Sequence, residues 1–209
     1  MTDLVAMLGI NLVLCAACAR LLCRGQVMQP WMRWLLAVIF IVLWLPVGPA
    51  HIPALAYVRG VSSDLSVTLV LLACLGLMRR LRGLPVVAGP ESTSVFMVVA
   101  LAALLLYPAA LGWGDIDTYR PGFGSPTMLL ALLVLCAGCW LRGLRLLPLF
   151  ISAALLAWAA GLMESTNLWD YLLDPWLASS AFVHCLWAGI TKLRHRAKPS
   201  PGSPVAVNG

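Results

Sequence analysis

Long apolar runs recur along the chain, and short polar segments separate them. A helix needs about 20 apolar residues to cross a bilayer core of about 30 Å, and seven runs approach that length. They predict helical spans near residues 4–22, 34–48, 61–78, 94–112, 127–141, 146–163 and 174–190. The expected fold is therefore all-α: a polytopic integral membrane protein, with a bundle of about seven transmembrane helices over residues 1–191.

Composition narrows the class of protein. Of the 209 residues, 62% are hydrophobic and 11% are charged, whereas soluble domains carry roughly 25% charged residues. A water-soluble protein of this size could not cover its surface with so few charged residues. The excess apolar surface is expected to face lipid, so the lipid bilayer is the expected partner. The net charge of +6 comes from basic residues scattered between apolar runs, without a basic face, so nucleic acid is not an expected partner.

The distribution of charge predicts the orientation. If the N-terminus lies outside, every basic residue except Arg59 and Arg120 falls on the inner side, and every acidic residue except Glu91 falls on the outer side. Basic residues control topology and favour the cytoplasmic side. We therefore expect an N-terminus outside and a cytoplasmic C-terminus, most simply in a bacterial inner (plasma) membrane. Residues 192–209, basic and then rich in Pro, Ser and Gly, are expected to form a disordered cytoplasmic tail. Because no basic residue precedes Arg20, we expect the first span to be retained rather than cleaved as a signal peptide.

Residues that cap helices stand before the odd-numbered spans, which all begin on the outer side. Such residues accept the free backbone N–H groups of the first turn, and Pro is tolerated at the first helical position. The candidates are Asp3, Asp64, Ser125 before Pro126, and Asp174 before Pro175. Asn167-x-x-Asp170 fits a capping box that opens a short helix, residues 168–173, before the seventh span.

Other charged residues of the outer loops have no such explanation. Glu164 follows the C-terminal end of the sixth span, where the helix dipole disfavours a negative charge. Since unpaired charges at headgroup depth are costly, we expect Arg59, Asp117, Arg120 and Glu164 to approach one another. They form either a structural salt-bridge network or a ligand site. The candidate ligand- or partner-binding residues are Arg59, Asp64, Asp115, Asp117, Arg120, Glu164 and Asp170.

Two CxxC pairs, Cys15-x-x-Cys18 and Cys136-x-x-Cys139, raise the possibility of redox or metal chemistry. Both pairs fall in the inner halves of their spans, away from the oxidising outer face that a disulfide generator needs. We expect these cysteines to pack as small apolar residues between helices. A haem held by two histidines would need them to face each other at one depth of the bundle, and the sequence offers no such pair. We therefore predict no metal and no cofactor.

Three function classes remain, and no motif in the chain identifies a known family. The favoured class is a non-catalytic membrane subunit or accessory protein, whose outer charged cluster holds a membrane-protein partner, a second copy or a lipid headgroup. The alternatives are an outer-leaflet enzyme, which acts on a lipid-linked or phosphate-bearing substrate held by arginine, and a small transporter or channel. A concave pocket around the charged cluster favours the enzyme, and a flat paired network favours the accessory role.

Overall fold

The computed structural model describes residues 2–23, 28–84, 90–115 and 117–197. Over these residues the chain is all-α, as predicted, with nine α-helices, one 3-10 helix and one two-stranded sheet of two-residue strands. Seven helices match the seven predicted runs: α1 (Thr2–Cys23), α2 (Pro30–Val42), α4 (Val67–Leu81), α5 (Pro90–Ala110), α6 (Pro126–Leu141), α7 (Leu146–Ala159) and α9 (Pro175–Ala197). The shorter elements are β1 (Pro46–Val47), β2 (Ile52–Pro53), α3 (Ala54–Ser62), η1 (Arg120–Gly122) and α8 (Leu168–Leu172).

Two of the described helices, α1 over Asp3–Cys23 and α5 over Pro90–Ala110, are both long and apolar enough to cross a membrane by themselves. The helices α2, α6 and α7 are apolar but shorter.

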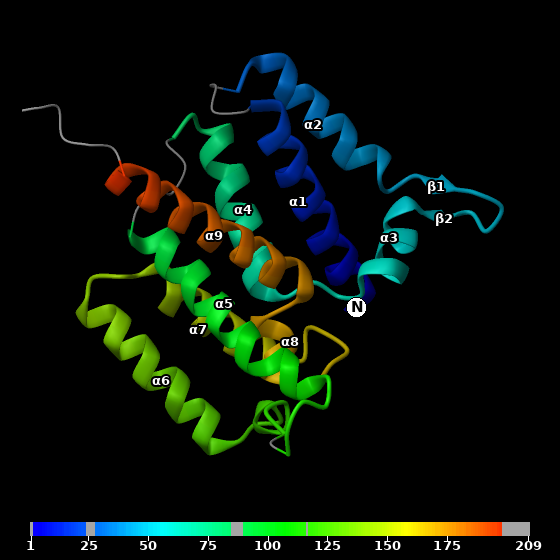
Figure 1. Ribbon diagram of the computed structural model, residues 1–209. Helices are drawn as coiled ribbons and strands as arrows, with labels where there is room; N and C mark the ends of the chain where they lie inside the picture. Colours follow the sequence, from blue (N-terminus) through cyan, green and yellow to red (C-terminus); the bar gives the residue numbers. More distant parts are fainter. Residues whose placement is uncertain (1, 24–27, 85–89, 116, 198–209) are drawn as a thin grey trace, which may run out of the picture.

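The second predicted span, residues 34–48, is wrong over its last six residues, because α2 ends at Val42. Pro46 has no N–H to donate to the carbonyl of Val42, and Leu45 takes that carbonyl instead through a tighter turn. The carbonyl of Phe40 accepts from the Asn11 side chain of α1, at 2.9 Å. The chain then forms the β1–β2 hairpin, which projects from the bundle (Figure 1).

The third predicted span, residues 61–78, is also interrupted. The chain breaks between α3 and α4, where Ser63 has a φ of 59° and a ψ of −168°. The cap of α4 is Ser66, whose hydroxyl accepts from the backbone N–H of Leu69 at 3.2 Å. The prediction that Asp64 caps this helix is therefore wrong, and its carboxylate is left for another partner.

The core lies where α4, α5, α7 and α9 meet, and α1 packs on α4 at one side. Small residues such as Ala103 of α5 and Ala181 of α9 are fully buried and let the helices approach closely. In Figure 1, α2 and α6 flank the bundle on opposite sides. Buried Met32 and Leu36 are the side chains of α2 in the cluster that it shares with α1.

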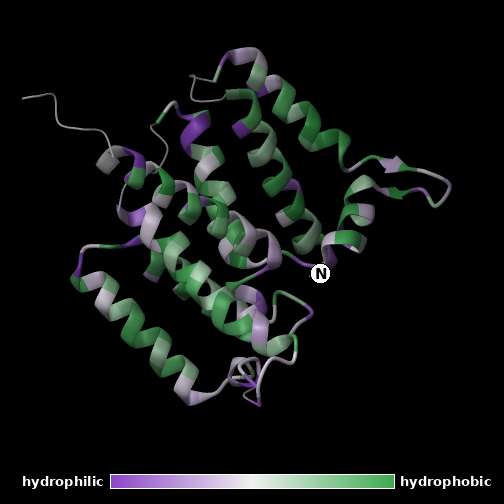
Figure 2. Cartoon of the chain, viewed as in Figure 1, coloured by the Kyte–Doolittle hydropathy of each residue, from purple (hydrophilic) through white to green (hydrophobic). Residues whose placement is uncertain are grey.

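Apolar side chains also point outward along the long helices. Leu105 of α5 is 72% exposed, Leu141 at the end of α6 is 86% exposed and Leu156 of α7 is 72% exposed. In Figure 2 hydrophobic colour covers the lengths of the helices, while hydrophilic colour gathers at their ends and in the loops. The last helix, α9, includes residues 192–197, which were predicted to begin the tail; residues 198–209 lie outside the described residues.

Candidate functional site

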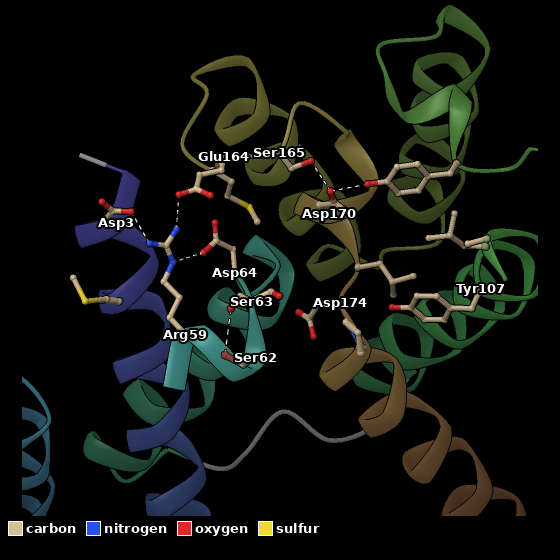
Figure 3. A pocket seen from close by; sticks show the side chains of 18 of the residues that line it. Asp3, Arg59, Ser62, Ser63, Asp64, Tyr107, Glu164, Ser165, Asp170 and Asp174 are labelled. Carbon is tan, nitrogen blue, oxygen red and sulfur yellow. Dashed lines mark hydrogen bonds and ion pairs between the residues drawn. The ribbon is translucent and has the colours of Figure 1, made fainter. Parts of the chain in front are cut away.

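One end of the bundle holds a hollow of about 960 Å³. Several segments converge there: the start of α1, α3 and the α3–α4 link, the end of α5, the turn before η1, the loop after α7, α8 and the start of α9 (Figure 3). We call it the acidic pocket, because most of its ionisable lining residues are carboxylates. Its principal polar residues are Asp3, Arg59, Asp64, Tyr107, Tyr119, Glu164, Ser165, Asp170 and Asp174.

Arg59, in the last turn of α3, is the hub of one wall (Figure 3). Its Nε donates to Asp64 at 2.7 Å, its Nη1 to Asp3 at 2.5 Å and its Nη2 to Glu164 at 2.8 Å. The hydrogen bond to Asp64, followed by the one to Asp3, raises the pKa of Arg59 above its ordinary value. Each of the three guanidinium nitrogens therefore donates to a carboxylate, and Arg59 joins α1, α3, the α3–α4 link and the loop after α7.

The facing wall is built around Asp170, in α8. Its carboxylate accepts from the hydroxyls of Tyr119, at 2.8 Å, and Ser165. Burial and the hydrogen bond to Asp170 raise the pKa of Tyr119 to about 12. Asn167 caps α8 as predicted, since its side chain accepts from the N–H of Trp169 at 2.9 Å. The capping box itself is wrong, because the N–H of Asn167 donates to the Ser165 hydroxyl rather than to Asp170.

Asp174 forms the floor between these walls and is only 4% exposed. One carboxylate oxygen accepts from the N–H of Leu177 at 2.8 Å, so the predicted cap of α9 is confirmed. The other oxygen accepts from the N–H and the hydroxyl of Ser66, which ties the start of α9 to the start of α4. The hydroxyl of Tyr107 points toward Asp174 from α5 (Figure 3).

The remaining predicted residues lie elsewhere. Asp117 accepts from the N–H groups of Tyr119 and Arg120 at 3.0 and 3.1 Å, which stabilises the turn that leads into η1. Asp115 and Asp117 line a separate hollow of about 320 Å³ beside the end of α5. Within the described chain Arg120 forms no ion pair, so the pairing predicted for Asp117 and Arg120 with the Arg59 cluster is not formed.

Sequence reasoning also assigned some residues the wrong role. Asp3, predicted as a cap, lies in the first turn of α1 and pairs with Arg59 instead. Ser125 precedes α6 as predicted but makes no cap hydrogen bond, because its hydroxyl bonds to that of Thr127. Tyr107, Tyr119 and Ser165 were not selected as site residues. In the sequence Tyr119 and Ser165 stand close to acidic residues of the predicted outer segments, whereas Tyr107 lies within the predicted span 94–112 and has no such signal.

The chemistry of the acidic pocket follows from this inventory. Five carboxylates face one guanidinium, and three of the five already hold that guanidinium, so the pocket favours a positively charged group over an anion. Among the described residues, no group of three or more His, Cys, Asp or Glu is placed to hold a metal ion.

The cysteines contribute nothing to this pocket. Cys15 lies buried in α1 and donates its S–H to the Asn11 side chain at 3.5 Å, and Cys139 belongs to the main core. Replacement of all four cysteines of the two CxxC pairs by Ala is still expected to leave a folded, metal-free protein. Zinc or iron bound stoichiometrically to the unaltered protein, and lost from that variant, would contradict this.

Comparison of the chain with family models, with curated proteins and with solved structures gives no match.

Proposed function

We propose that the chain is an integral membrane protein of a bacterial inner membrane, with its seven long helices across the bilayer and its N-terminus outside. The outward apolar side chains, such as Leu105 and Leu156, support this proposal, because water would disfavour so many exposed apolar faces. The charge pattern supports it too. The acidic pocket lies near the start of α4, at one end of the bundle. Arg79 and Arg80 lie in the last turn of α4, at the opposite end of that helix.

Glu91, the acidic residue that breaks the charge pattern, has a structural role. Its carboxylate accepts from the backbone N–H of Arg145 at 3.1 Å and so links the start of α5 to the start of α7. Both residues belong to the predicted inner side. A carboxylate used in this way needs no outer location.

We propose further that this is a non-catalytic membrane subunit or accessory protein, and that its acidic pocket holds a positively charged group of a membrane partner or lipid. The observation that carries this proposal is the engagement of Arg59 by three carboxylates, while Asp170 and Asp174 meet only neutral donors. Excess negative charge in a partly buried hollow attracts a cation strongly.

The alternatives fit these contacts less well. An outer-leaflet enzyme has one observation in its favour, the concave shape of the pocket. However, the arginine that would hold a phosphate is already bound by Asp3, Asp64 and Glu164. A transporter needs ionisable groups deep in its helices. In the described helices the Asp, Glu, Lys and Arg residues lie in or near the terminal turns.

Topology is tested first. Reporter fusions after Arg82, after Arg145 and at the C-terminus should report a cytoplasmic location, and a fusion at Thr118 should report an external one. A C-terminus outside the cell would overturn the orientation, and a chain purified in water without detergent would overturn the membrane assignment.

Pocket occupancy is tested in cells. A photoreactive amino acid at Ala110, in the last turn of α5 and on the pocket lining, should crosslink to a lipid or to one membrane protein. Asp170→Asn should weaken that product, because it removes one negative charge from the pocket. Asp115→Asn, at an exposed carboxylate outside the pocket, is the matched control and should not. Equal products from both variants would mean that the charge of the pocket does not recruit the group.

A further inference from the structure

A second hollow lies beside the acidic pocket and is almost entirely apolar. It measures about 580 Å³, and the middle of α1, the exposed side of α3, the start of α4 and Trp176 of α9 form its walls. We call it the apolar groove. Val61, on its rim, is 87% exposed, so the groove opens on the outer surface of the bundle.

The helix α3 separates the two hollows. Ala56, Arg59 and Gly60 face the acidic pocket, while Tyr57, Val58 and Val61 face the apolar groove. Ser62 lines both. One face of α3, with Arg59, therefore lines the acidic pocket, and another face, with Tyr57, Val58 and Val61, lines the apolar groove.

A single stripe of α1 connects the same two hollows. Asp3 and Met7 line the acidic pocket, and Ile10 and Leu14 continue the stripe into the apolar groove. These positions are spaced by three or four residues, so they lie on one helix face. At 1.5 Å per residue, Asp3 and Leu14 lie about 16 Å apart along the axis. That length matches half of a bilayer core of about 30 Å, which is the depth of one leaflet.

On the basis of the membrane location proposed above, we propose that the two hollows together bind one lipid of the outer leaflet whose headgroup carries an ammonium. The ammonium lies among the carboxylates of the acidic pocket, and an acyl chain lies in the apolar groove. Charge complementarity selects this occupant: a headgroup with only negative charge meets five carboxylates and an arginine whose three nitrogens each already donate to a carboxylate.

The test compares phosphatidylethanolamine with phosphatidylglycerol of identical acyl chains. The two lipids share a phosphate and differ in carrying an ammonium or hydroxyls. The purified protein is exposed to equal amounts of both in detergent, and the retained lipid is measured by native mass spectrometry. We expect retention of phosphatidylethanolamine to exceed that of phosphatidylglycerol about fivefold, as for one partly screened ion pair.

Two variants separate the headgroup from the chain. Asp170→Asn keeps an oxygen for the Tyr119 hydroxyl but removes a charge, so it should reduce the preference between the lipids. Val61→Trp fills the groove and should reduce retention of both lipids. The matched controls are Asp115→Asn, outside the pocket, and Val183→Trp, at an exposed site of α9, and both should behave as the unaltered protein.

Equal or greater retention of phosphatidylglycerol would overturn the ammonium-lipid inference, as would equal retention by Val61→Trp and Val183→Trp. Neither result touches the membrane assignment, which the reporter fusions test separately. A protein that stays monodisperse without detergent would instead remove the foundation of both proposals.

Discussion

Arg59 holds three segments of the chain together, and its replacement should destabilise the protein more than that of any exposed arginine. In Arg59→Gln the guanidinium is lost and three carboxylates are left without their partner. The side chains of Arg59 and Asp64 are 20% and 16% exposed, whereas those of Asp3 and Glu164 are 64% and 65% exposed. The three pairs therefore differ in strength.

The magnitude follows from burial. A half-buried carboxylate left unpaired costs about 1–3 kcal/mol, and each exposed pair contributes about 0.2–1 kcal/mol. Arg59→Gln should therefore cost about 2–4 kcal/mol. A free-energy loss of 1 kcal/mol lowers the melting temperature of a chain of this length by about 2–4 °C, so we expect a decrease of roughly 5–15 °C. Arg59→Lys should lose most of this stability, because one ammonium cannot reproduce a three-sided guanidinium.

Thermal unfolding in detergent, followed by tryptophan fluorescence, measures the effect. Arg120→Gln is the control, because Arg120 forms no ion pair among the described residues; its melting temperature should change by no more than about 2 °C. Double-mutant cycles should give a larger coupling of Arg59 to Asp64 than to Glu164. Of these two couplings, only that to Glu164 should vanish in about 1 M salt, where the Debye length is about 3 Å.

Two results would refute this reasoning. One is an Arg59→Gln variant as stable as Arg120→Gln, which would mean that the ion pairs do not hold the loops. The other is a coupling to Glu164 that exceeds the coupling to Asp64, which would mean that burial does not set the strength of these pairs.

Three further predictions concern the backbone and the facing wall. Gly122→Ala should destabilise the protein by about 1–3 kcal/mol, because a Cβ there would overlap the Asn167 side chain. The control is Gly138→Ala, which has open space around it and should be neutral or stabilise helix α6 by up to about 1 kcal/mol. Thermal unfolding of the two variants measures the difference, and equal effects would contradict the prediction. Ser63→Gly should stabilise by about 1–2 kcal/mol, because φ of 59° with ψ of −168° suits only glycine, and a lower melting temperature would contradict it. Burial and the hydrogen bond to Asp170 raise the pKa of Tyr119 to about 12. Tyr119 therefore stabilises the fold fully below pH 10 and loses that contribution as the pH rises through 12. In Tyr119→Phe the late-titrating part of the tyrosine absorbance should decrease by one tyrosine, and an unchanged late part would contradict this.

The sequence by itself determined the helical class and the approximate position of every long helix. Apolar runs separated by Gly, Pro and charged residues are local signals, so they are readable without the fold. Two caps were readable for the same reason: Asn167 and Asp174 bond to N–H groups two or three residues away. Their partners lie within one turn, and local spacing suffices to identify them.

The tertiary structure decided which distant groups meet. Pro46 is a local reason for the early end of α2, but the Phe40 carbonyl in its last turn also accepts from the Asn11 side chain, 29 residues away. The partners of Arg59 include Asp3 and Glu164, 56 and 105 residues away. An arginine with several carboxylates in reach pairs with those that packing places beside it, and spacing along the chain does not contain that information. Asp3 and Asp64 looked like helix caps because a carboxylate near a helix start satisfies either an N–H or a guanidinium, and the packing of α3 on α1 and the path of the α3–α4 link decided between the two.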